Sequence, residues 1–166
     1  MAKYWVVDTN LLVDWCIFNV AETYPAPDSA QTVQRLQYLP LAIYRDFLVE
    51  KLRERKVTTS HIVAAETGWV GHRLVKRGTS HQFLQSLHRI CHQHEIAVSA
   101  PNYERVSALA QEAGFGHGHP DASLVVLSQE CSEQGHSPTI LTGEQALASW
   151  CAINNVSAER FEFNGQ

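Results

Sequence analysis

The chain has 166 residues, of which 45% are hydrophobic and 18% are charged, as is typical of one globular domain. It holds 13 Lys and Arg residues against 17 Asp and Glu residues, and the net charge of −4 argues against a basic nucleic-acid-binding domain on charge alone. The composition also excludes disordered, collagen-like and disulfide-scaffold proteins. We therefore expect residues 1–166 to form a single domain with its own hydrophobic core.

The charges are distributed unevenly along the chain. Residues 1–34 hold one base and four acids, residues 35–105 hold eleven bases and six acids, and residues 106–166 hold one base and seven acids. An acidic beginning and end can therefore meet beside a basic middle in the fold. Solvated helices with an ordinary content of Lys and Arg explain the same pattern.

The sequence gives no indication of export or of a membrane span. The cysteines Cys16, Cys91, Cys131 and Cys151 form no C-x-x-C pair and follow no signal peptide, so we expect them to be reduced thiols. No run approaches the roughly 18 apolar residues that a membrane-spanning helix needs. We predict a cytoplasmic protein that does not contact a membrane.

In the first third of the chain, a strand and two helices are expected. Residues 4–7 form a short apolar run that predicts a buried strand, and polar residues after it can begin a helix over residues 11–18. Residues 19–38 contain two prolines and predict a loop or insertion. A second helix is expected over residues 39–55.

The rest of the chain alternates between strands and helices. We expect strands over residues 57–59, 96–98, 139–142 and 160–163, and helices over residues 60–76, 80–92, 102–114, 121–133 and 144–153. Short apolar strands that alternate with helices are typical of βαβ units. The sequence therefore predicts an α/β fold with a central, mostly parallel sheet flanked by helices.

Four acidic residues occupy positions that acids usually avoid. Asp8 directly follows the first strand, and Glu144 follows the strand over residues 139–142; ligands of open α/β sheets bind at such strand ends. Glu66 and Asp121 share the apolar stripes of their predicted helices. An ionised carboxylate there is costly unless a cation or hydrogen-bond donors meet it.

Each of these acids has an alternative, structural explanation. Asp8 and Asp121 can cap helices, and Glu66 can reach water from the edge of its stripe. Together, however, four converging carboxylates would raise one another's pKa unless cations neutralise them. Mg²⁺ or Mn²⁺ with oxygen ligands suits such a site. These ions activate water and stabilise charge on a leaving oxygen, so the residues predict a metal-dependent phosphodiesterase.

The sequence resembles the PIN-domain ribonucleases in four ordered motifs. They are Val6-Val7-Asp8-Thr9-Asn10-Leu11-Leu12, the segment TSHIVAAE that ends at Glu66, Pro120-Asp121-Ala122-Ser123-Leu124, and Ile140-Leu141-Thr142-Gly143-Glu144. Their order and spacing run from Val6 to about Phe161. The resemblance implies a Rossmann-like PIN fold, an acidic pocket that holds Mg²⁺ or Mn²⁺, and endonucleolytic hydrolysis of RNA.

The resemblance also implies roles for individual residues. Asp8, Glu66 and Asp121 match the acids of the family's metal site. Asn10 matches a polar position beside the first acid, and Thr142 matches the family's Thr or Ser, whose hydroxyl helps to organise the pocket. We expect these residues, with Glu144, to form the catalytic site, and the four acids to hold the metal.

Glu144 departs from the family pattern, which usually has Asp at this position. The extra methylene moves the carboxylate by about one C–C bond, which matters for an ion that requires near-octahedral geometry. The alternative is therefore a degenerate PIN fold that binds RNA or a protein without catalysis. An aspartyl-phosphate phosphatase of the haloacid-dehalogenase type is a more distant alternative, because Asn10 replaces the second acid of its D-x-D-x-T motif.

Basic residues of the central third could contact the substrate. We expect six of them to rim the acidic pocket and bind the RNA backbone, although a solvated helix end explains them equally well. They are Arg53, Arg55, Lys56, Arg73, Lys76 and Arg77. His117 and His119, on a glycine-rich loop before Asp121, could also touch a substrate phosphate, but a polar loop is the simpler explanation.

The resemblance further implies partners. It suggests a homodimer and, for toxin-type members of toxin–antitoxin pairs, an antitoxin protein that blocks the pocket. This chain is longer than the compact toxin-type members, mainly through residues 19–38.

Overall fold

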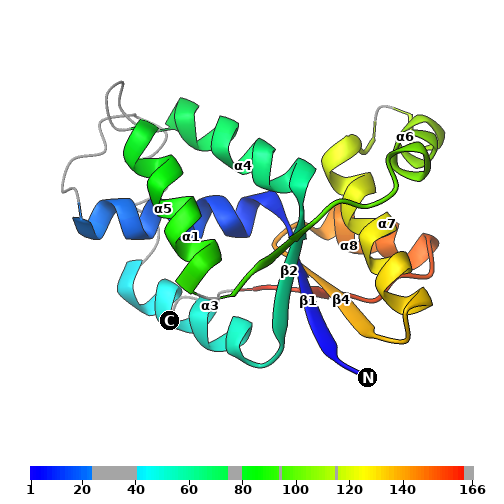
Figure 1. Ribbon diagram of the computed structural model, residues 1–166, viewed down its shortest axis with the longest axis horizontal. Helices are drawn as coiled ribbons and strands as arrows, with labels where there is room; N and C mark the ends of the chain where they lie inside the picture. The colour runs from blue at the N-terminus through cyan, green and yellow to red at the C-terminus, as the bar shows by residue number, and fades with distance from the viewer. Residues whose placement is uncertain (24–40, 75–79, 94, 115, 163–166) are drawn as a thin grey trace.

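The computed structural model describes residues 1–23, 41–74, 80–93, 95–114 and 116–162, which form a mixed α/β fold (Figure 1). The sheet has five strands in the order β3-β2-β1-β4-β5, and every neighbouring pair is parallel. The strands are β1 (Lys3–Val7), β2 (Lys56–Ser60), β3 (Ala97–Ser99), β4 (Ser137–Thr142) and β5 (Ala158–Arg160). The predicted α/β fold with a parallel central sheet is confirmed, and its arrangement is Rossmann-like.

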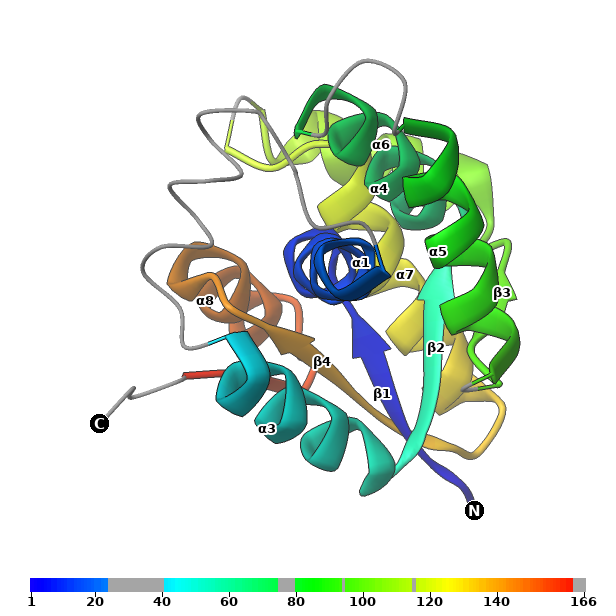
Figure 2. The ribbon, with the colours of Figure 1, turned by 90° about the vertical axis from the view of Figure 1, so that its left-hand side faces the viewer.

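Seven helices in the described part of the chain flank this sheet. They are α1 (Thr9–Thr23), α3 (Leu41–Arg53), α4 (His61–Leu74), α5 (Ser80–Gln93), α6 (Tyr103–Glu112), α7 (His119–Glu133) and α8 (Gln145–Ile153). Figures 1 and 2 show α1, α3 and α5 on one side of the sheet and α6, α7 and α8 on the other. Both faces of the central strands are therefore covered.

The two central strands, β1 and β4, are the most apolar. Trp5, Val6 and Val7 of β1 and Ile140 and Leu141 of β4 are fully buried. A strand covered by helices on both faces requires such a continuous apolar run rather than an alternating one. Val7 pairs in register with Leu141, so the two strands end side by side.

Polar side chains and a proline define the starts of three helices. Ser60 Oγ accepts a hydrogen bond from the Val63 N–H at 3.0 Å, and Asn102 Oδ1 accepts one from the Arg105 N–H at 3.0 Å. These are the capping contacts that first-turn N–H groups need. Pro120 lies in the first turn of α7, where its missing N–H costs nothing.

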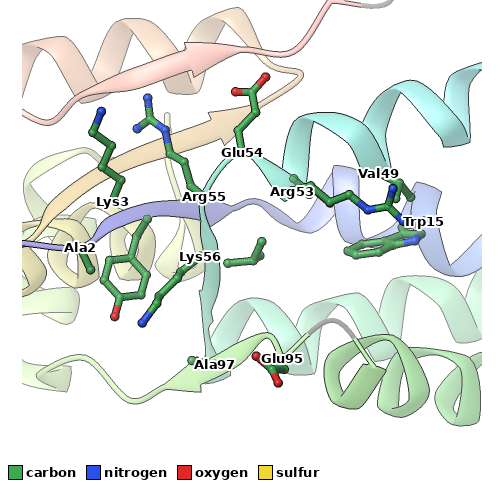
Figure 3. A pocket seen from close by; sticks show the side chains of 13 residues that line it. Ala2, Lys3, Trp15, Val49, Arg53, Glu54, Arg55, Lys56, Glu95 and Ala97 are labelled. Atoms are coloured by element: carbon green, nitrogen blue, oxygen red, sulfur yellow. The ribbon is translucent and has the colours of Figure 1, made fainter.

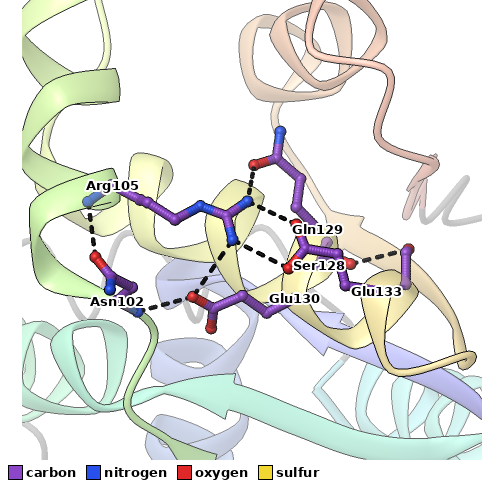
Figure 4. A network of polar contacts seen from close by, with 7 residues as sticks. Asn102, Arg105, Ser128, Gln129, Glu130 and Glu133 are labelled. Atoms are coloured by element: carbon purple, nitrogen blue, oxygen red, sulfur yellow. Dashed lines mark hydrogen bonds and ion pairs between the residues drawn. The ribbon is translucent and has the colours of Figure 1, made fainter.

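Arg105 joins α6 to α7. Its Nη2 donates hydrogen bonds to Glu133 Oε1 at 3.0 Å and to Gln129 Oε1 at 3.2 Å, while the Asn102 N–H donates to Glu130 Oε1 at 3.0 Å (Figure 4). These contacts hold the C-terminal half of α7 against the start of α6. The first turn of α7, at its other end, carries Asp121.

Several predicted boundaries are wrong, among them those of the last strand, which was predicted over residues 160–163 and is Ala158–Arg160, and of two helices. Helix α1 continues to Thr23, so residues 19–23 belong to a helix and not to the predicted loop, because the first proline after Asp8 is Pro25. Residues 24–38 of that loop lie outside the described residues. Helix α7 begins at His119, two residues earlier than predicted, because Pro120 is accommodated within its first turn.

Candidate functional site

Asp8 directly follows β1, at the edge of the sheet where the parallel strands end, which we call the carboxyl edge. Its side chain is only 4% exposed. Oδ1 accepts a hydrogen bond from the Leu11 N–H at 3.1 Å, and Oδ2 accepts one from the Thr142 hydroxyl. Burial raises the pKa of Asp8 to about 6, and the negative charges of Glu144 and Asp121 add to this rise, whereas the two hydrogen bonds oppose it.

Thr142, the last residue of β4, links Asp8 to the segment that begins α8. Its hydroxyl donates to Asp8 and accepts a hydrogen bond from the Glu144 N–H at 3.0 Å. The side-chain amide of Asn10 donates to the Glu144 carboxylate. From β1 the chain adds β2 and then β3 on one side of the sheet, and from β4 it adds β5 on the other side, so the strand order reverses between β1 and β4. Ligands of open α/β sheets bind at such a reversal of strand order.

Helices α4 and α7 bring the other two acids to the same edge. Glu66, in the second turn of α4, accepts a hydrogen bond from the Thr9 hydroxyl. Asp121, in the first turn of α7, has its Oδ2 at 2.8 Å from His117 Nδ1. Both helices start near the carboxyl edge, so their early turns face Asp8.

The four predicted acids line one pocket. This pocket, which we call the acidic pocket, has a volume of about 130 Å³ and is lined by Asp8, Thr9, Asn10, Glu66, Val70, Asp121 and Glu144. Thr142 is fully buried, so it contacts Asp8 from behind rather than facing the pocket. The structure thus brings together the acids and Asn10, with Thr142 in support.

The donor set of the acidic pocket fits a hard divalent cation, but its side chains are not yet arranged around one. Carboxylate, amide and hydroxyl oxygens are the ligands that Mg²⁺ and Mn²⁺ prefer. Each carboxylate is engaged by its own donor, and the described residues contain no group of three or more His, Cys, Asp or Glu side chains arranged to hold a metal ion. To coordinate one ion together, the four carboxylates would have to come closer to one another.

Three of the six predicted RNA-binding bases do not rim the acidic pocket. Arg53, Arg55 and Lys56 lie where the strands begin, which we call the amino edge, and with Lys3 they line a separate pocket of about 750 Å³ (Figure 3). A five-residue strand at about 3.3 Å per residue separates the two edges by roughly 16 Å. This corrects the prediction, because residues that precede a strand lie at its amino end. Three further bases, Arg73, Lys76 and Arg77, lie outside the described side chains.

Arg55 has a structural role at the amino edge. Its guanidinium lies 4.0 Å from the ring centroid of the fully buried Trp5, and its Nη1 donates to Thr139 Oγ1 at 2.7 Å. The Trp5 indole N–H donates to the Lys51 carbonyl at 2.9 Å. Arg55 therefore covers the beginning of β1 and ties β2 to β4.

Sequence reasoning missed several residues around the acidic pocket. Thr9 and Val70 line it, and His117 contacts Asp121. His117 was considered as a contact for substrate phosphate, but its contact with Asp121 was not predicted, because His117 lies on the loop before α7, where helical spacing does not apply. Trp150, which stacks on His117, had no local signal because it lies on a different helix.

Comparisons with known proteins do not assign a family. No protein-family model and no curated protein matches the chain. A solved structure described as a domain of a functionally unknown protein from Methanocaldococcus jannaschii DSM 2661 is 16% identical to it, with a TM-score of 0.46, and the match covers 100% of this chain and 95% of the other. This degree of similarity identifies no activity, so the PIN resemblance stays a prediction.

Within the described ranges, no helix combines the length and the apolar character needed to cross a membrane.

Proposed function

We propose that this protein is a metal-dependent endoribonuclease of the PIN type, which hydrolyses phosphodiester bonds of RNA with Mg²⁺ or Mn²⁺. The main support for this proposal is the acidic pocket. Asp8, Glu66, Asp121 and Glu144 come from four different parts of the chain and line one pocket beside the β1–β4 pair. Carboxylates in such a position are suited to binding a cation and, through it, a phosphate group.

The charge of the acidic pocket supports a cation as its ligand. Among the described residues, no Lys or Arg forms an ion pair with any of the four acids, and Asp121 alone has an ionisable partner, His117. Glu144 and Asp121 help to raise the pKa of Asp8 to about 6. A divalent cation would remove this repulsion and favour the ionised carboxylates.

The residues around the pocket have distinct tasks in this proposal. Asp8, Glu66, Asp121 and Glu144 would hold the ion, Thr142 fixes the rotation of the Asp8 carboxylate, and Asn10 orients Glu144. When bound, the ion supplies Lewis-acid stabilisation of charge on the phosphate and lowers the pKa of water. The burial of Asp8 limits competing hydration of the carboxylate.

The volume of the acidic pocket supports a polymeric substrate. About 130 Å³ is well below the roughly 300–1,000 Å³ of pockets that enclose small-molecule ligands. A pocket of this size can hold an ion and a phosphate group, and the rest of the substrate would lie outside it. The phosphatase alternative is disfavoured because Asn10 replaces the second acid of its motif.

One observation favours the non-catalytic alternative. Glu144 stands where PIN domains usually have Asp, and the described residues contain no group of three or more His, Cys, Asp or Glu side chains arranged to hold a metal ion. If the four carboxylates keep this separation when cations are present, the protein binds RNA without cutting it.

A cleavage assay separates these functions. The full chain is incubated with a fluorescent unstructured RNA in Mn²⁺, in Mg²⁺ or in excess EDTA, and the products are resolved by length. We expect internal cuts with either metal and none with EDTA. In Asp8→Asn and Asp121→Asn the rate should fall more than about a hundredfold, because even residues that only support metal ligands contribute ten- to a hundredfold.

A matched control is Glu112→Gln, an exposed acid of α6 that does not line the acidic pocket. It should cleave like the wild type. RNA that is bound but uncut in every metal would support the binding module. Release of phosphate from a small phosphomonoester, lost in Asp8→Asn, would support the phosphatase.

A further inference from the structure

His117 lies between the acidic pocket and α8. Its Nδ1 is 2.8 Å from Asp121 Oδ2, and its ring stacks on the indole of Trp150, with 4.3 Å between the ring centroids and 6° between the planes. The His117 side chain is only 15% exposed. These contacts join three separate segments: the loop before α7, the first turn of α7, and α8.

The two contacts together restrict the imidazole. A nearly parallel stack against an indole fixes the tilt of the ring plane. The contact with Asp121 fixes the rotation of the ring within that plane and makes Nδ1 the donor nitrogen, because an ionised carboxylate only accepts hydrogen bonds. His117 therefore presents one N–H to Asp121 in a set direction.

The same arrangement restricts Asp121. His117 is its only hydrogen-bond or ion-pair partner among the described side chains, and it engages Oδ2. With that oxygen held, the other carboxylate oxygen, Oδ1, is available to the acidic pocket, which Asp121 lines. Carboxylate ligands in metal sites are commonly oriented by such a neighbouring donor.

Helix α8 supports two of the four acids. Glu144 directly precedes the first residue of this helix, and Trp150 lies within its nine residues. The position of α8 thus affects Glu144 directly and Asp121 through Trp150 and His117. No pattern along the sequence links Trp150 with Asp121.

We propose that His117, stacked on Trp150, is a positioning residue that orients the Asp121 carboxylate toward the acidic pocket. The orientation of Asp121 follows from the contacts described above. Its expected consequence, stronger binding of a divalent cation, rests on the proposed function. His117 acts through Asp121 and does not itself touch the ion or the RNA.

His119 provides a matched control. It lies two residues further along the chain, and its ring stacks on the exposed Tyr103 with 6.0 Å between centroids. It does not line the acidic pocket, and the hydrogen bond of Asp121 among the described side chains is to His117 and not to His119. A variant at His119 therefore removes a nearby imidazole without removing the contact between His117 and Asp121.

The first measurement needs no metal. In the full chain, ¹⁵N NMR of the histidine rings should show His117 with a proton on Nδ1 that exchanges slowly with water. Asp121→Asn and Trp150→Leu should both alter this signal, whereas His119→Ala should leave it unchanged. A His117 ring with an unprotonated Nδ1, or a signal insensitive to Asp121→Asn, would overturn the positioning role.

The second measurement is Mn²⁺ affinity by calorimetry. His117→Ala should weaken binding roughly ten- to a hundredfold, as expected for removal of a supporting residue, and His119→Ala should bind like the wild type. His117→Asn should recover part of the affinity, because its amide can place an N–H near the position of Nδ1. Unchanged or tighter binding in His117→Ala would overturn the inference, since His117 would then compete with the ion.

The two measurements separate the inference from the proposed function. If the wild type fails to bind Mn²⁺ at millimolar concentration, the metal-dependent function is wrong. The NMR signal of His117 then still decides whether it orients Asp121.

Discussion

The carboxyl edge and the amino edge of the sheet both gather charge, but they do so in different ways. At the carboxyl edge, Asp8 is buried and four acids line a pocket of about 130 Å³ with neutral or histidine partners. At the amino edge, four bases and the acids Glu54 and Glu95 line a pocket of about 750 Å³, and Lys56 is exposed to water. The carboxyl edge holds the Asp8 carboxylate inside the fold, with Glu66 and Asp121 half-buried and Glu144 exposed, whereas the amino edge presents Lys3, Arg53 and Lys56 to solvent.

This difference indicates which edge can do chemistry. A buried carboxylate is constrained by backbone N–H groups and neighbouring strands, so its position is reproducible and its pKa is perturbed. An exposed lysine is mobile and its charge is screened by salt, so it attracts a phosphate group without holding it in a fixed position. The expected effects of substitutions at the two edges therefore differ in size.

The largest expected effect concerns Asp8 and pH. Its pKa in the folded chain is about 6, above the ordinary value of 3.8, so the folded state binds more protons between these values and loses stability as pH rises through this window. Asp8→Asn removes the buried charge and should stabilise the apo protein at pH 8 by up to about 3 kcal/mol. Urea unfolding at pH 8 and pH 4 measures this difference.

The stabilisation expected of Asp8→Asn should be nearly absent at pH 4, where the Asp8 carboxyl of the folded wild type is largely neutral. Thr142→Ala at the same two pH values is a useful comparison, because it removes the hydroxyl that favours ionised Asp8 and should therefore increase the loss of stability toward pH 8. An Asp8→Asn variant less stable than the wild type at pH 8 would contradict the account of a destabilising buried charge.

The next effect is stabilisation by metal. If the acidic pocket binds Mn²⁺, a concentration of a hundred times Kd should stabilise the fold by about 2.7 kcal/mol, seen as a rise in Tm. Asp121→Asn should abolish this rise. Lys56→Ala at the amino edge should keep it, and the absence of the rise in that variant would mean that the two edges are not independent.

A smaller effect is expected at Arg55. Truncation to Ala removes the interaction with buried Trp5 and the hydrogen bond to Thr139, and should cost about 1–2 kcal/mol in the free energy of unfolding. Arg53→Ala, two residues earlier and exposed, should change it by less than about 0.5 kcal/mol. Equal effects would show that Arg55 is no more structural than its neighbour.

The smallest effect concerns RNA affinity at the amino edge. If Lys3 and Lys56 bind phosphates, the Lys3→Ala/Lys56→Ala double variant should weaken binding of single-stranded RNA a fewfold at low salt. It should also reduce the slope of log affinity against log salt by about 0.7 for each phosphate that is no longer neutralised. Fluorescence anisotropy in EDTA measures this without cleavage. An unchanged slope would exclude the amino edge from RNA binding.

Much of the acidic pocket could be predicted from the sequence because parallel strands end at one edge. Asp8 and Glu144 follow neighbouring strands, so their meeting needed only the order of elements. Glu66 and Asp121 were detectable because acids on apolar stripes are unusual. These signals are local in the sequence. Together with the parallel order of the strands, they were sufficient to predict that the four acids lie near one another.

Contacts between distant segments could not be predicted in this way. The Thr9–Glu66 bond and the stack of His117 on Trp150 depend on how helices pack, which no periodicity encodes. The basic residues were misplaced for a different reason. They were assigned to the pocket from the basic charge of the central third, whereas the length of β2 separates Arg53, Arg55 and Lys56 from the carboxyl edge.

The parallel pairing of β1 with β4 also determines when the acidic pocket can exist during folding. Asp8 follows β1, which the ribosome makes before the other four strands, yet the hydroxyl that holds Asp8 belongs to Thr142, 134 residues later. Contacts of such long sequence separation form slowly, because the entropy of closing the loop is lost before the contact contributes any favourable energy. The acids therefore stay apart while the intervening residues are synthesised, and the pocket assembles only after residues 137–144 have emerged.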